Sequence, residues 1–147
     1  TVNSYRRLRP GMLSGYWANW GIDNRLSTVR IPSGRGSSTR IEHRMADGTA
    51  SPHLLLAALL AAMLDGIERD LLPGDPQEGD GDAVPNTDRH APHSLPEAIA
   101  ALRADTYLVQ SLGDDLVRCF TLLREAEWGR WLDTVTDWEQ REYGRVY

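Results

Sequence analysis

The first third of the chain alternates apolar and polar residues with a period of two, the pattern of half-buried β-strands. Apolar side chains share one side of residues 27–31 and of residues 40–45, and polar side chains share the other. Residues 33–38 between them are small and include two glycines. We therefore predict an antiparallel hairpin with a mobile tip, preceded by a further strand end over residues 5–8.

From residue 51 onward, apolar residues recur at helical spacing. Ser51 and Pro52 suit the N-cap and first turn of a helix, and residues 54–67 are apolar nearly all round. We expect this helix to be buried. Ser94 and Glu97 have the spacing of a capping box and start a second helix. A third helix is predicted over residues 114–131, and residues 136–143 end this helical half.

Strands grouped first and helices afterwards are typical of an α+β fold rather than of alternating α/β. We predict antiparallel strands over about residues 1–45 and packed helices over about 51–147, with the helices covering one face of the sheet. An acidic segment rich in Gly, Pro, Asp and Asn, about residues 73–93, interrupts the helices and is expected to be an exposed, mobile loop. Residues 1–147 are treated as one domain or a portion of one.

The composition excludes several classes of protein. The longest unbroken apolar run has 11 residues, residues 54–64, whereas a membrane-spanning helix needs roughly 18 or more. A membrane protein is therefore not expected. A single cysteine, Cys119, excludes an internal disulfide and a multi-cysteine zinc site, and it reads as a small core residue on a helix. We expect a cytoplasmic protein.

The basic residues are unevenly distributed. All 16 are arginine, and eight of them lie in residues 1–44 against only Asp23 and Glu42, a local net charge of +6. The remaining residues carry a net charge of −11. Arginine presents a planar fork suited to carboxylate or phosphate, so the basic third is expected to face an anion. A nucleic acid, a nucleotide and a small acid are the candidate anions, and the nucleic acid is the least favoured because no nucleic-acid motif is present.

The strongest local pattern is the row Arg40, Glu42 and Arg44, which period-two alternation puts on one side of a strand about 6–7 Å apart. One interpretation is a solvated sheet face with exchanging ion pairs. The other is a site where Glu42 holds a cation and the arginines hold anions. Further arginines converge on this face if the sheet is antiparallel: Arg7, Arg25 and Arg30.

The histidines carry weaker signals. His90 and His93 lie in the acidic loop without a third ligand fixed by secondary structure, so we interpret them as solvated rather than metal-binding. His43 lies on the opposite strand face from Glu42, which favours packing or hydrogen bonding over catalysis. Trp17 and Trp20 flank a polar stretch and are candidates for the wall of a pocket.

Taken in order, these residues resemble the C-terminal part of the catalytic domain of the glutamine synthetase family. The resemblance covers essentially the whole chain, and the combination of short stretches is more specific than any one of them. The stretches are Asn3-Ser4-Tyr5-Arg6-Arg7-Leu8, Asp23-Asn24-Arg25, Val29-Arg30-Ile31-Pro32, Arg40-Ile41-Glu42-His43-Arg44, Ala50-Ser51-Pro52-His53-Leu54 and Ser94-Leu95-Pro96-Glu97-Ala98.

The resemblance implies an ATP-dependent ligase that joins glutamate to ammonia or an amine through a γ-glutamyl phosphate, with Mg²⁺ or Mn²⁺. A carboxylate needs this activation because oxide is a poor leaving group. By position, Arg25 and Arg30 resemble catalytic arginines that face phosphate, and Arg30 and Arg40 resemble arginines that bind the nucleotide cofactor. Arg7 and Arg44 resemble the arginines that bind glutamate, and Glu42 resembles a metal-holding carboxylate on the nucleotide side.

One departure from the family pattern concerns the amine. Ammonia-using members place a Tyr-Glu-x-Pro flap after Pro10-Gly11, whereas this chain has Met12-Leu13-Ser14-Gly15, so Leu13 replaces the flap carboxylate. The stretch from Ala18 to Arg25 and His43 look more like the glutamate–amine ligase branch, which acts on polyamines or small amines. An apolar residue at this position favours a larger, partly hydrocarbon amine.

A second departure is the absence of the family's other metal ligands, its nucleotide pocket and its N-terminal β-grasp domain. The resemblance also implies a homo-oligomeric ring with active sites between subunits. The isolated chain is therefore expected to be inactive, as the C-terminal portion of an active-site domain. The alternative is a truncated, catalytically inactive family member that acts as an assembly or regulatory module.

Overall fold

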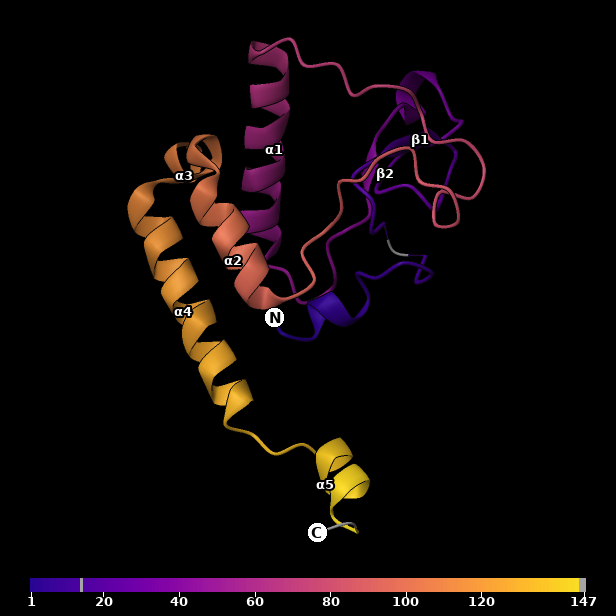
Figure 1. Cartoon of the computed structure of the whole chain (residues 1–147). Helices are drawn as coiled ribbons and strands as arrows, with labels where there is room; N and C mark the ends of the chain where they lie inside the picture. Colours follow the sequence, from indigo (N-terminus) through magenta and orange to yellow (C-terminus); the bar gives the residue numbers. More distant parts are fainter. Residues whose placement is uncertain (14, 146–147) are drawn as a thin grey trace.

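The computed structural model describes residues 1–13 and 15–145 and consists of a strand half followed by a helical half (Figure 1). This order confirms the predicted α+β class. The strands are β1 (Trp20–Ile22), β2 (Val29–Ile31) and β3 (Glu42–His43). The helices are α1 (Pro52–Glu68), α2 (Leu95–Ala104), α3 (Thr106–Leu112), α4 (Asp114–Leu132) and α5 (Asp137–Tyr143).

The three strands form one sheet in the order β1-β2-β3. β2 and β3 are antiparallel with Arg30 opposite Glu42, which confirms the predicted hairpin. β1 was not predicted, because three residues in an aromatic and glycine stretch show no alternation. It pairs with β2 in parallel, so the sheet is mixed rather than purely antiparallel.

The segment predicted as a further strand end is instead the 3₁₀-helix η1 (Ser4–Arg6). Local hydrogen bonds form it, because the amides of Ser4 and Arg6 donate to the carbonyl groups of Thr1 and Asn3. The tip of the hairpin contains a second 3₁₀-helix, η2 (Gly36–Ser38). A short local turn thus replaces the predicted extended backbone near residue 5, and another forms part of the predicted hairpin tip.

The helix starts follow the predicted signals. α1 begins at Pro52 and α2 begins after Ser94, whose Oγ accepts a hydrogen bond from the Glu97 amide. The Glu97 carboxylate accepts from the amide of His93 (2.8 Å) rather than from that of Ser94, so the box is displaced by one residue. A complete capping box stands at Thr136 and starts α5. α4 matches the predicted third helix, whereas α3 was not predicted.

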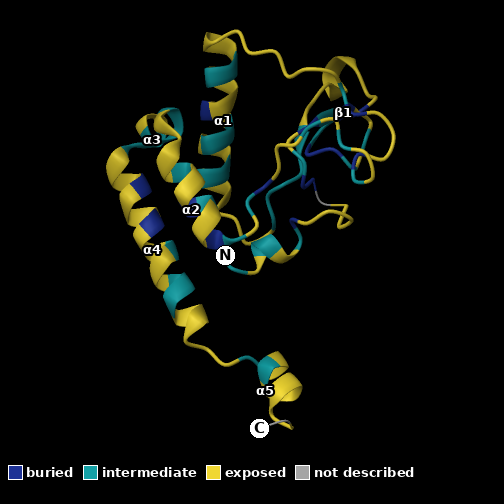
Figure 2. Cartoon of the chain, in the orientation of Figure 1, coloured by how far each residue is buried: buried dark blue, intermediate teal, exposed yellow. Residues whose placement is uncertain are grey.

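The prediction that α1 is buried is wrong. Only Ala61 of this helix is buried, and much of its apolar surface is exposed (Figure 2). The helices pack mainly on one another, α1 on α3 and α2 on α4, rather than over the sheet, which also differs from expectation. The large exposed apolar side chains of α1 are Leu56, Leu60, Met63, Leu64 and Ile67.

The acidic segment, not a helix, lies against the sheet (Figure 1). Most of its residues are exposed, as predicted, but Gln77, Gly81 and Ala91 are buried. Gln77 is 6% exposed, and its backbone amide donates to the carbonyl of Trp20 in β1 (2.7 Å). Its Oε1 accepts from Asn19 Nδ2 (3.3 Å) and from the amide of Asn86 (2.8 Å). A buried glutamine therefore anchors this segment to the strand half.

A small apolar cluster closes the strand half near the helices. It consists of Leu8, Tyr16 and Ala91, with an antiparallel bridge between Trp17 and His90 beside it. Cys119, in contrast, is exposed on α4 and is not the core residue that its neighbours suggested. Among the described helices, none combines the length and apolarity needed to cross a bilayer.

The position of Gln77 predicts a measurable cost of removing its side chain. In Gln77→Ala, the Asn86 amide and Asn19 lose a buried acceptor, so the free energy of unfolding should fall by about 1–3 kcal/mol. Amide hydrogen exchange of residues 75–86 should accelerate. Urea unfolding measures the first effect, and Gln110→Ala, on an exposed residue of α3, is the matched control. Equal stability of the two variants would contradict the anchoring role.

Candidate active site

The hairpin brings three of the predicted site residues into direct contact. Arg30 Nη1 donates to Glu42 Oε2 (2.8 Å), and Arg40 Nη2 and Nε donate to Glu42 Oε1 (2.8 and 3.1 Å). The antiparallel register explains this, because Arg30 stands opposite Glu42 and Arg40 precedes it by two residues on the same side. Two members of the predicted row, Arg40 and Glu42, are therefore in direct contact, and Arg30 joins them from β2.

Arg44 and Arg7 extend this cluster along the chain that follows β3. Arg44 Nη2 donates to the carbonyl of Leu13 (3.2 Å), and Arg7 Nη1 donates to the carbonyl of Met45 (2.7 Å). Burial lowers the pKa of Arg44 from its ordinary value, and the nearby charges of Arg30 and Arg25 lower it further. Arg30 and Arg25 thus lie close enough to Arg44 to disfavour its charged form.

Two nitrogen atoms of the cluster lack a hydrogen-bond partner in residues 1–13 and 15–145. They are Nη1 of Arg44 and Nε of Arg30, and both are buried. Buried donors are normally paired, so each such atom is a position for an additional acceptor. An anion with several oxygen atoms is the ligand type that fits these donors.

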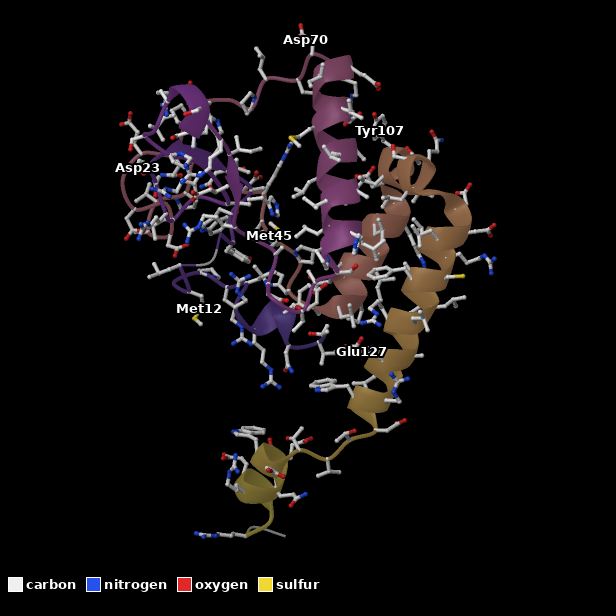
Figure 3. The ribbon with its side chains drawn as sticks, turned by 180° about the vertical axis from the view of Figure 1, so that it is seen from behind. Met12, Asp23, Met45, Asp70, Tyr107 and Glu127 are labelled. Atoms are coloured by element: carbon white, nitrogen blue, oxygen red, sulfur yellow. The ribbon has the colours of Figure 1, made fainter. Side chains whose placement is uncertain are left out.

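Arg30 has a second acidic partner that sequence reasoning did not assign to the site. Its Nη2 forms an ion pair with Asp23, the residue that follows β1. The hydrogen bonds that Arg30 donates to Glu42 and Asp23 raise the pKa of Arg30, and the hydrogen bonds that Glu42 accepts from Arg30 and Arg40 lower the pKa of Glu42. Figure 3 shows side-chain nitrogen and oxygen atoms crowded around the labelled Asp23. The only available signal was its place in Asp23-Asn24-Arg25.

Arg25, the fifth predicted arginine, lies near Arg44 but is exposed. Among the described residues it forms no ion pair with a carboxylate. The cluster therefore holds five guanidinium groups against two carboxylates, Glu42 and Asp23. This excess of positive charge makes the face suited to an anion.

The residues fit one ligand position of a divalent cation. Glu42 Oε1 already accepts two hydrogen bonds, whereas Oε2 accepts one and keeps an acceptor position. Mg²⁺ is commonly held by one or two carboxylates together with substrate phosphates. Within the described residues, no group of three or more acidic, histidine or cysteine side chains forms a complete cation site. Glu42 would thus provide one ligand to such a cation, and the described residues around it do not complete a coordination shell.

The histidines lie outside the cluster. His90 stacks on Tyr16 (ring centroids 5.2 Å apart), and His93 Nε2 hydrogen-bonds to Tyr16 Oη (3.2 Å). His43 is half-buried, and burial lowers its pKa, so its neutral form is favoured. The Nε1 of Trp20 donates to the carbonyl of Gly74 (3.1 Å) in the acidic segment.

The fold and this cluster define an α+β domain with an arginine-rich face suited to anions. The family model of the catalytic domain of glutamine synthetase matches residues 1–143. The chain is 36% identical over 152 residues to glutamine synthetase of Methanococcus voltae and 38% identical over 152 residues to that of Thermus thermophilus. Each alignment covers 99% of this chain and 34% of the relative.

Solved structures agree with the sequence matches. A structure titled "Apo GmaS without ligand" superposes with a TM-score of 0.79 and 37% identity, and it covers 96% of this chain and 32% of that one. A "GmaS/ADP complex" superposes with a TM-score of 0.82 and 34% identity, covering 97% and 34%. The chain belongs to the glutamine synthetase family and spans about a third of the length of these relatives. The GmaS neighbours fit the expected amine ligase branch.

The contacts of Glu42 predict how its titration depends on Arg40. Because two arginines lower the pKa of Glu42 below its ordinary 4.5, the ionised form stabilises the fold. That contribution is complete above pH 4.5 and is lost as the pH falls through the lower pKa of the folded protein. In Arg40→Gln, the pKa should move up toward 4.5, and the loss should begin at higher pH.

Carboxyl ¹³C NMR titration of Glu42 measures this shift. Arg35→Gln is the control, since Arg35 donates to the carbonyl groups of Pro32 and Gly34 and not to Glu42. An unchanged pKa in Arg40→Gln would show that the contact does not persist in solution.

Proposed function

We propose that this chain forms part of the active site of an ATP-dependent ligase that joins glutamate to an amine through a γ-glutamyl phosphate. The observation that supports it is the five-arginine cluster around Glu42, in a chain of the glutamine synthetase family. A reaction that brings a carboxylate and a triphosphate together concentrates negative charge. Guanidinium groups fixed before the substrates arrive stabilise that charge without reorganisation.

Each residue has a proposed role. Arg44 and Arg7 bind the carboxylates of glutamate, and the unpartnered Nη1 of Arg44 is a donor for this contact. Arg25 and Arg30 face the transferred phosphoryl group as catalytic residues, while Arg30 and Arg40 bind the phosphates of ATP. Glu42 supplies one ligand to Mg²⁺ or Mn²⁺, which would neutralise phosphate charge when bound.

We further propose that the natural nucleophile is an amine larger than ammonia. Leu13 is 61% exposed, and its carbonyl is held by Arg44, so an apolar side chain stands beside the proposed glutamate site. GmaS, a glutamate–methylamine ligase, superposes on nearly all of this chain. Ser14, the next flap position, lies outside the described residues. The rest of the active site and a homo-oligomeric ring belong to this proposal as family features.

Substrate assays on the protein that carries this chain test the proposal. Phosphate release from ATP and glutamate should be faster with methylamine, ethanolamine or putrescine than with ammonium, because Leu13 offers no carboxylate to an ammonium ion. Turnover with ammonium alone would overturn the amine preference. Turnover with none of the four nucleophiles would overturn the ligase activity itself.

Arg44 is the sharpest variant for the glutamate site. Removing one partner of a buried charge pair typically costs 2–5 kcal/mol, so Arg44→Gln should lower kcat/KM for glutamate by about 100-fold or more. Arg118→Gln, on the exposed surface of α4 where Arg118 pairs with Asp115, removes the same charge far from the cluster and is the control. Similar kinetics for both variants would contradict the assignment of Arg44.

A further inference from the structure

Asp23 holds the central arginine of the cluster from the side opposite Glu42. The Arg30 side chain is 14% exposed and lies between two carboxylates, with Nη2 on Asp23 and Nη1 on Glu42. Glu42 is also held by Arg40, whereas Asp23 forms no other ion pair among the described residues. Asp23 therefore pairs with Arg30 alone among the described residues, whereas Glu42 pairs with both Arg30 and Arg40.

The backbone presents the Asp23 carboxylate independently of Arg30. Asp23 has a left-handed backbone with φ of 50°, and its amide donates to the carbonyl of Ile31 in β2 (2.8 Å). The next residue, Asn24, donates through Nδ2 to the carbonyl groups of Gln77 and Gly79 (3.1 and 3.0 Å). The turn is thus held to β2 and to the acidic segment by hydrogen bonds that do not involve the Arg30 side chain.

This arrangement matters when Glu42 binds a cation. A cation at Glu42 draws the carboxylate away from Arg30 and repels the guanidinium at the same time. With Asp23 present, Arg30 keeps a counter-charge and its orientation while Glu42 is released. Without Asp23, Glu42 is the remaining carboxylate that holds Arg30, and the two groups stay locked together.

We propose that Asp23 is a positioning residue that fixes Arg30 and thereby frees Glu42 for a divalent cation. The inference rests on the proposed function, because it takes Glu42 as a cation ligand. Asp23 acts through Arg30 and touches neither substrate nor cation.

Mn²⁺ binding to the protein that carries this chain, measured by EPR of free Mn²⁺ without nucleotide, tests the inference. Asp23→Asn keeps a residue type that tolerates the left-handed backbone, so the fold is preserved. It should weaken Mn²⁺ binding about 5-fold, the size of an ordinary coupling energy between contacting groups. Glu78→Gln removes an exposed carboxylate of the acidic segment and should change Mn²⁺ binding less than 2-fold.

A double-mutant cycle separates positioning from a general charge effect. In an Arg30→Gln background, Asp23→Asn should have no further effect, because its target is gone. An equal 5-fold loss in that background would overturn the inference. So would wild-type affinity in Asp23→Asn when Glu42→Gln weakens binding. Wild-type affinity in Glu42→Gln would instead overturn the proposed metal role of Glu42.

Discussion

The pairing of β2 with β3 is the constraint on which the rest of the site depends. Guanidinium groups on one sheet face repel one another, and the basic third of the chain has only two carboxylates to separate them. The antiparallel register sets one of these, Glu42, opposite Arg30 and two residues from Arg40. A shift of one residue would turn Glu42 to the other face together with Arg40, and it would leave Arg30 with Asp23 alone as its carboxylate partner. The register therefore decides whether Arg30 and Arg40 share Glu42 on one face of the sheet.

Local sequence signals predicted the elements whose cause is local. The alternation in the first third gave the β2–β3 hairpin, and Pro52, Ser94 and the α4 pattern gave helix positions within a residue or two. The predictions that failed concerned long-range packing. Apolarity all round α1 predicted burial, but burial depends on what packs against the helix, and here α3 is its main neighbour. The polarity of residues 73–93 predicted their exposure, which most of them show, but not the burial of Gln77, whose Oε1 accepts a hydrogen bond from the amide of Asn86.

The candidate site also contains residues that local patterns predicted and contacts that they did not. Period two alone placed Arg40, Glu42 and Arg44 on one side, and the family resemblance added the roles proposed for the arginines. Asp23 and the carbonyl of Leu13 were missed because both are presented by left-handed backbone, with φ of 50° and 53°. Non-glycine residues seldom adopt this left-handed conformation, and the identity of an Asp or Leu side chain does not predict it. Sequence patterns therefore did not predict the contacts that these turns make, and only the structure shows them.

The anchoring of residues 73–93 also has a kinetic side. Helix α4 and its neighbours α2 and α3 form from residues close in sequence, so their contacts carry little loop-closure entropy. The strand half is different, since its Asn19–Gln77 hydrogen bond joins residues 58 positions apart, across all of α1. Closing that loop raises the contact order of one half only. The Arg30–Glu42 pair of the arginine face, by contrast, joins residues only 12 positions apart, so it is the attachment of this half to the acidic segment that closes the long loop.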